Sequence, residues 1–165
     1  MSTTAAPQIV PAGKGRRLFV LGDVYTLKLT GADTAGTHAL VELCIAPGNG
    51  TPPHVHHRED ETFLILEGRL TFSVGGRELS AGPGDVVYGP RDVPHHFRNG
   101  GSLPARLLFL VTPAGFENFF VEIGEVPPDG PAEPRPPGPQ DIERIKALAP
   151  RYGLELLVPA EGHPT

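Results

Sequence analysis

The sequence predicts a closed all-β architecture, either a sandwich or a barrel, with short helices near its C-terminal end. About nine short runs rich in β-branched and aromatic residues are separated by turns roughly every eight to twelve residues, a spacing typical of sandwiches and barrels. Proline or glycine bounds most of these runs, and no helical pattern alternates with them before residue 113. The pattern therefore argues against alternating β/α units.

Most of the predicted strands end at a turn signal that the sequence makes visible. Gly22-Asp23 separates the first two strands, Pro47-Gly48 ends the third, and Gly75-Gly76 is the dipeptide expected in a two-residue hairpin. The predicted strands are residues 17–21, 24–30, 37–46, 61–66, 70–74, 77–79, 85–88, 95–98 and 105–112. Residues 17–112 are thus predicted to form the barrel, after a flexible N-terminal lead of residues 1–16.

The pattern becomes helical after residue 112. Apolar side chains in residues 113–123 stand at positions i, i+3, i+4 and i+7, which is one face of a helix. These side chains are Phe116, Phe119, Phe120 and Ile123. Packing against the barrel is the simpler interpretation of this face, and closure of a substrate pocket is the alternative.

A second helix is predicted over residues 141–152, with Asp141 placed to cap its start and Gly153 to stop it. Between the two helices, residues 126–139 are rich in proline, which can neither continue a helix nor join a sheet interior. They are predicted to be a semi-extended connector. Residues 113–165 therefore read as a helical and Pro-rich extension packed on the same domain.

Composition and charge exclude several classes of protein. The chain has 165 residues, 39% of them hydrophobic and 20% charged, as in an ordinary globular domain. Its net charge is -5, and the 14 Lys and Arg residues form no basic stripe, so nucleic acid is not an expected partner. No apolar run is long enough to span a bilayer, and the first residues lack a signal-peptide core. We expect a cytoplasmic protein with no membrane association.

The histidines are concentrated in two patches. Five of the seven histidines lie there: His54, His56, His57, His95 and His96. Because side chains alternate along a strand, His54 and His56 should share one face. His95 and Phe97 should likewise share a face of their own strand.

Glu61 opens the next predicted strand, so three imidazoles and one carboxylate are expected to converge inside the barrel. Such a mixed nitrogen and oxygen set suits one divalent transition metal ion: Fe, Mn, Ni, Co, Cu or Zn. His57 and His96 should point to the opposite faces of their strands and are expected to be surface residues or neighbours of the ligands. Glu59 and Asp60 are expected to be solvated loop carboxylates, and the alternative is that the bend brings either of them close to the metal.

Both patches resemble the two sequence motifs of the cupin superfamily. The first motif, G-x5-H-x-H-x4-E-x6-G, is matched by Gly48, His54, His56, Glu61 and Gly68. The second, G-x5-P-x-G-x2-H-x3-N, is matched by Gly84, Pro90, His95 and Asn99. It departs from the pattern only at Asp92, where the family has glycine. Because Asp tolerates positive φ better than most residues, we expect the turn to survive.

The resemblance implies a cupin jelly-roll β-barrel that binds metal through His54, His56, Glu61 and His95. The layout of the tail after residue 112 is similar to that of small microbial cupins related to quercetin 2,3-dioxygenase. That similarity implies a ring-cleaving dioxygenase that acts on a flavonol-like enol or phenol with O2. Glu61 would then be both a ligand and the catalytic base. Cupins of this size commonly form homodimers, which is the expectation here.

Two other functions stay open at this point. One is a redox-neutral cupin enzyme, such as an isomerase, cyclase or lyase, and the other is a cupin that binds a small molecule without catalysis. Candidate substrate contacts are Phe63, Tyr88, Phe97 and Phe116. Each of them also fits simple packing, because side chains fill barrel interiors whether or not a ligand enters.

Overall fold

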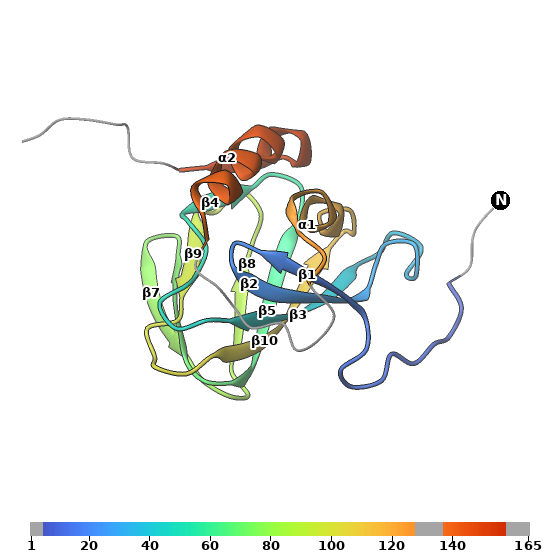
Figure 1. Ribbon diagram of the computed structural model, residues 1–165, viewed down its shortest axis with the longest axis horizontal. Coiled ribbons are helices and arrows are strands. Elements are labelled where there is room, and N and C mark those ends of the chain that lie inside the picture. The colour runs from blue at the N-terminus through green and yellow to red at the C-terminus, as the bar shows by residue number, and fades with distance from the viewer. Residues whose placement is uncertain (1–4, 128–136, 158–165) are drawn as a thin grey trace, which may run out of the picture.

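The computed structural model describes residues 5–127 and 137–157, which form two antiparallel sheets (Figure 1). The six-stranded sheet has the order β1-β2-β3-β10-β5-β8, and the five-stranded sheet has the order β11-β4-β9-β6-β7. Strand bounds in the first sheet are β1 Arg16–Val20, β2 Asp23–Leu29, β3 Ala39–Ile45, β10 Ala105–Thr112, β5 Asp60–Glu67 and β8 Val86–Gly89. Those in the second are β11 Leu154–Leu156, β4 His54–His56, β9 His95–Arg98, β6 Leu70–Val74 and β7 Arg77–Ala81. The all-β prediction is confirmed.

The core lies between the sheets because the strands alternate apolar and polar side chains. In β3 and β10 every second residue is buried, from Ala39 to Ile45 and from Ala105 to Val111. These two strands pair along their whole length, and β10 pairs with β5 on its other side. Burial of one face of each strand stabilises the barrel by roughly 25 cal/mol per Å² of apolar surface.

Two turns confirm what the sequence predicts about backbone conformation. Gly75 and Gly76 both have positive φ, at 56° and 78°, as the tight hairpin between β6 and β7 requires. Asp92 has a φ of 63°, so it adopts the left-handed conformation in place of the family's glycine. The second motif therefore keeps its turn despite the substitution.

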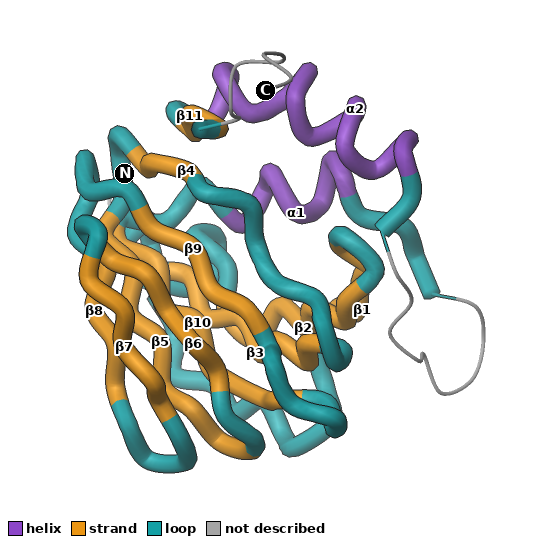
Figure 2. The backbone as a smooth tube through the Cα atoms, turned by 90° about the vertical axis from the view of Figure 1, so that its left-hand side faces the viewer, coloured by secondary structure: helices purple, strands orange, loops and turns teal. Residues whose placement is uncertain are grey.

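The C-terminal helices lie together across one end of the strands (Figure 2). They are α1 Glu117–Ile123 and α2 Pro139–Leu148, followed by a 3-10 turn, Ala149–Tyr152. All four apolar side chains of the predicted first helical face are buried. None of the described helices is long and apolar enough to cross a membrane.

The start of α2 differs from the prediction. Gly138 is the cap residue, and Asp141 lies three residues into the helix, where its carboxylate accepts the backbone N–H of Gly138 at 2.6 Å. The end agrees with it, because Gly153 has a φ of 66° and stops the 3-10 turn. Most of the predicted connector, residues 128–136, lies outside the described residues. Residues 5–15 of the predicted lead carry no helix or strand.

Strand β11 was not predicted from the sequence. Residues 154–158 form only a short apolar run in the sequence, but Leu154 to Leu156 pair antiparallel with β4. Leu154 is opposite His56, and Leu156 is opposite His54. The C-terminal segment thus covers the strand that carries two of the predicted metal ligands.

Candidate metal centre

Three histidines and one glutamate converge inside the barrel. His54 and His56 come from β4, His95 from β9 and Glu61 from β5, and each of the four is at most 8% exposed. One ligand atom from each residue lies within 4.8 Å of the others. His54 is directly opposite His95 in the pairing of β4 with β9, whereas Glu61 reaches the cluster from the other sheet.

The backbone orients two of the imidazoles. Nδ1 of His54 donates to the carbonyl of Pro52 at 2.7 Å, and Nδ1 of His95 donates to the carbonyl of Val93 at 2.9 Å. Because a carbonyl can only accept, both Nδ1 atoms carry a proton. This leaves Nε2 of each ring as the atom that can bind a metal.

The carboxylate of Glu61 lies between two of the histidines. Its Oε2 is 2.5 Å from Nε2 of His95, and its Oε1 is 3.0 Å from Nε2 of His56. Burial alone would raise the pKa of Glu61, but the charge of His56 and the hydrogen bonds from both imidazoles hold that pKa well below its usual range. Glu61 is therefore ionised at neutral pH.

His54 and His56 titrate differently although they share one face of β4. Burial lowers the pKa of His54 to about 4. Burial also acts to lower the pKa of His56, but the carboxylates of Glu61 and Glu59 outweigh it and raise that pKa to about 9. His56 is therefore protonated at neutral pH when no metal is bound.

The donor set fits a divalent transition metal ion. It offers three imidazole nitrogens and one carboxylate oxygen within reach of a single point, and such mixed sites suit Fe, Mn, Co, Ni, Cu or Zn. Since the protein's ligand atoms must lose their protons to bind a metal, binding would displace the protons that His56 and His95 donate to Glu61 through Nε2.

Glu59 was wrongly expected to be solvated. It is only 5% exposed, and its Oε2 lies 3.5 Å from Nδ1 of His56. Neither of these two buried atoms has a hydrogen-bond partner among the described residues. A small movement would join them, so Glu59 is placed to orient His56 from behind. The sequence held only a weak signal for this position of Glu59. It is two residues before Glu61, but the direction of the intervening bend could not be predicted.

The other polar residues of the two patches point away from the cluster. His57 is partly exposed and lies between Asp92, at 2.6 Å, and Glu155, at 2.8 Å. Asp60 pairs with Arg91 at 2.9 Å near the surface. His96 follows His95 on β9 and is only partly buried, as expected for the opposite face.

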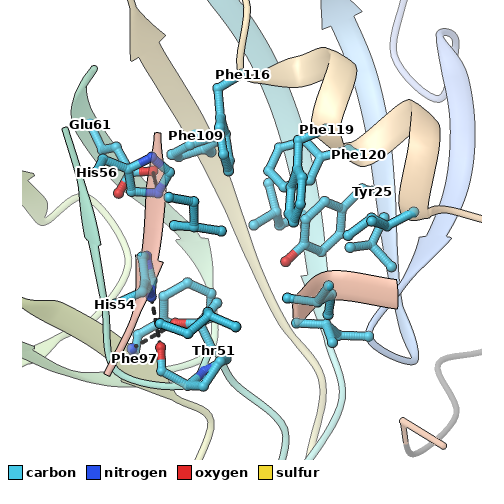
Figure 3. Close-up of a pocket in the computed structure, with 18 of the residues that line it drawn as sticks. Tyr25, Thr51, His54, His56, Glu61, Phe97, Phe109, Phe116, Phe119 and Phe120 are labelled. Atoms are coloured by element: carbon cyan, nitrogen blue, oxygen red, sulfur yellow. Dashed lines mark hydrogen bonds and ion pairs between the residues drawn. The ribbon is translucent and has the colours of Figure 1, made fainter. Parts of the chain in front are cut away.

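An apolar pocket adjoins the cluster (Figure 3). Phe63, Phe97 and Phe116 line it, as expected, and the ring of Phe116 meets that of His56 edge-on at 4.3 Å. Further lining residues, which no pattern in the sequence predicted, include Tyr25, Thr51, Phe109, Ile145, Leu154 and Leu156. Phe119, Phe120 and Ile123 of the α1 face also line the pocket, which favours the alternative of pocket closure.

Tyr88 does not join this pocket. Its side chain is 56% exposed, whereas Val87, the next residue on β8, is only 6% exposed. Alternation along β8 therefore turns Val87 inward and Tyr88 outward. The structure does not bring Tyr88 together with the other candidate substrate contacts.

Comparison with known families agrees with both the fold and the cluster. A model of the cupin domain matches residues 41–111, a range that holds all four candidate ligands. Residues 41–111 form a cupin domain. The cupin's two motifs therefore supply the converging residues, and its C-terminal extension supplies much of the pocket wall.

Curated relatives of this chain include proteins named for different activities. Quercetin 2,3-dioxygenase of Bacillus subtilis is 26% identical over 94% of this chain and 45% of its own length. The tetracenomycin polyketide synthase protein TcmJ of Streptomyces glaucescens is 31% identical over 48% of this chain and 52% of its own. The cupin spans about half the length of the curated relatives it matches.

Solved structures share the fold. The polyketide cyclase RemF from Streptomyces resistomycificus aligns with a TM-score of 0.57 at 24% identity, over 65% of this chain and 80% of that one.

Proposed function

We propose that this cupin is a metal-dependent dioxygenase that cleaves a ring of a flavonol-like enol or phenol with O2. The observation that carries the proposal is a cluster of three histidines and a glutamate at the wall of a pocket lined mainly by aromatic and aliphatic side chains. Similarity to a quercetin 2,3-dioxygenase over most of the chain supports it.

The roles of the residues follow from their positions. His54, His56, His95 and Glu61 would hold the metal, which when bound would supply a Lewis acid for the substrate oxygen and a centre for reaction with O2. Glu61 is placed to take the proton of the substrate hydroxyl, because its carboxylate is buried and ionised beside the cluster. The rings of Phe116 and its neighbours would hold the flat substrate and exclude water.

Replacement of Glu61 by Gln tests the role of the base. We expect Glu61→Gln to keep metal binding within about tenfold and to lose at least about 100-fold in flavonol turnover, a typical effect of removing a general base. Metal content by elemental analysis and O2 uptake with a flavonol give the two readouts. Glu67→Gln is a matched control on the same strand, because Glu67 pairs with Arg106 on the exposed side. Full turnover by Glu61→Gln would refute the base role.

A redox-neutral reaction is the second candidate. The same pocket suits a polycyclic aromatic or polyketone substrate, and the relatives include a polyketide synthase protein. An isomerase, cyclase or lyase would turn over equally well under argon, whereas a dioxygenase would stop. Tight ligand binding without turnover under any metal would favour the third possibility, a non-catalytic binding cupin.

The metal, the assembly and the location belong to the proposal as well. Elemental analysis of the purified protein would identify the metal among Fe, Mn, Ni, Co, Cu and Zn. We expect a homodimer in the cytoplasm, and light scattering after size-exclusion chromatography would measure the assembly.

A further inference from the structure

Tyr25 is a buried tyrosine in the wall of the pocket. It lies on β2, is 3% exposed, and packs edge-on against Phe120 with ring centroids 4.9 Å apart. Figure 3 shows it across the pocket from His54 and His56, with its hydroxyl directed into the space between the two walls. Its ring is part of the core, but its hydroxyl faces the cavity.

No hydrogen bond from the hydroxyl of Tyr25 to the protein occurs within residues 5–127 and 137–157, and this oxygen is not among the enclosed atoms without a partner, which are Nδ1 of His56 and Oε2 of Glu59. The hydroxyl faces the open space of the pocket instead. Tyrosines in protein interiors usually find a hydrogen-bond partner for this oxygen, and a molecule in the pocket can supply one.

The other polar side chains that line this pocket each have at least one protein partner. His54 donates to the carbonyl of Pro52, Glu61 accepts from two imidazoles, and Oγ1 of Thr51 accepts the backbone N–H of Phe97 at 3.3 Å. Burial, together with the charges of Asp23 and Glu61, raises the pKa of Tyr25 far above its usual value. Tyr25 is thus a protonated, uncommitted donor.

We infer that Tyr25 is a substrate-binding residue that donates a hydrogen bond to a second oxygen of the substrate, away from the oxygen held at the histidine and glutamate cluster. The inference rests on the proposed function and narrows its substrate class. The substrate would be a flat aromatic molecule with oxygens at both ends, such as a polyhydroxylated flavonol, rather than one whose oxygens all lie at the metal end.

Two flavonols and one substitution test the inference. Quercetin carries hydroxyls on its outer rings, and 3-hydroxyflavone lacks them. With full-length, metal-loaded protein under argon, fluorescence titration would give the Kd of each ligand for the wild type and for Tyr25→Phe. We expect Tyr25→Phe to bind quercetin about five- to tenfold more weakly, the effect of one hydrogen bond, and 3-hydroxyflavone within about twofold of wild type.

A stability measurement and a control variant separate this role from packing. Tyr25→Phe should melt at about the same temperature as wild type, because it keeps the ring and removes a hydroxyl that makes no hydrogen bond to the described residues. Tyr152→Phe is the matched control: Tyr152 contacts Phe116 and Phe119, but its hydroxyl bonds to Glu122 outside the pocket. It should leave both dissociation constants unchanged.

Three results would count against the inference, and they are distinguishable. Unchanged quercetin binding by Tyr25→Phe would overturn the role of Tyr25 and leave the proposed function standing. Equal weakening of both ligands would overturn the assignment to a second, distant oxygen. Failure of wild type to bind either flavonol would overturn the proposed substrate class and this inference together.

Discussion

The two histidines of β4 show how much a side chain's surroundings decide its chemistry. They are two residues apart on the same face, yet burial lowers the pKa of His54 to about 4, while nearby carboxylates outweigh burial and raise that of His56 to about 9. Alternation along a strand was enough to predict that both point inward. It did not reveal Glu59, whose carboxylate lies 3.5 Å behind the imidazole of His56.

We predict that Glu59→Gln weakens metal binding about 10- to 100-fold, because the carboxylate orients the imidazole of His56 and makes it a stronger ligand. Competition with a coloured chelator at neutral pH would measure the dissociation constant. Asp60→Asn is the control, since Asp60 is the neighbouring carboxylate but pairs with Arg91 instead. Equal metal affinity in the two variants would show that Glu59 has no such role.

At the scale of elements, a buried carboxylate ties three segments together. Asp23 begins β2, is 1% exposed, and through Oδ1 accepts the backbone N–H of Ala46 at 2.8 Å and the side-chain amide of Asn49 at 3.0 Å. It thereby joins β2 to the end of β3 and to the loop that leads to β4. Burial raises the pKa of Asp23 to about 6, although both hydrogen bonds act to lower it.

The sign of the resulting pH dependence follows from linkage. Because the folded pKa lies above the unfolded value of 3.8, the native state gains stability from protonating Asp23 below pH 3.8 and loses it as pH rises through about 6. Asp23→Asn removes this dependence while an amide oxygen can still accept both hydrogen bonds. We predict that the variant gains up to about 3 kcal/mol relative to wild type between pH 4 and pH 7.

Urea denaturation of the metal-free proteins at pH 4 and pH 7 would measure this difference. Other titrating groups cancel when the variant is compared with wild type at each pH. A stability difference that is the same at both pH values would mean that Asp23 titrates normally.

At the scale of the whole molecule, the candidate metal centre joins the two sheets. Its histidines belong to the five-stranded sheet, on β4 and β9, and Glu61 belongs to the six-stranded sheet, on β5. A ligand that binds only the folded chain stabilises it by mass action, by about 2.7 kcal/mol at 100 times its dissociation constant. Metal bound here would therefore hold the sheets together.

We predict that metal loading raises the melting temperature by about 5–10 °C at that excess, given a shift of roughly 2–4 °C per kcal/mol for a chain of this size. Calorimetry with and without chelator would measure the shift. His95→Ala should abolish it. His57→Ala should retain it, because His57 faces Asp92 and Glu155 rather than the cluster. Equal shifts in both variants would place the metal elsewhere.

Local patterns in the sequence were enough to predict which side chains face the barrel interior and which of them converge in the candidate metal centre. Strand alternation and motif spacing are local, so His54, His56, Glu61 and His95 were all predicted correctly to point into one cluster. Alternation also placed Phe63 and Phe97 inward. It left Tyr88 ambiguous, since either face of a short edge strand can carry an aromatic residue.

What surrounds those four side chains depends on the tertiary structure. Local periodicity states which face of a segment is apolar but not which distant segment covers it, because that choice depends on contacts between residues far apart in the chain. Leu154, for example, lies opposite His56 in a strand pairing that no local sequence pattern predicted. The same folding brought Tyr25 and the helix that carries Phe120 to the pocket, and it made the surroundings of the candidate metal centre mostly apolar.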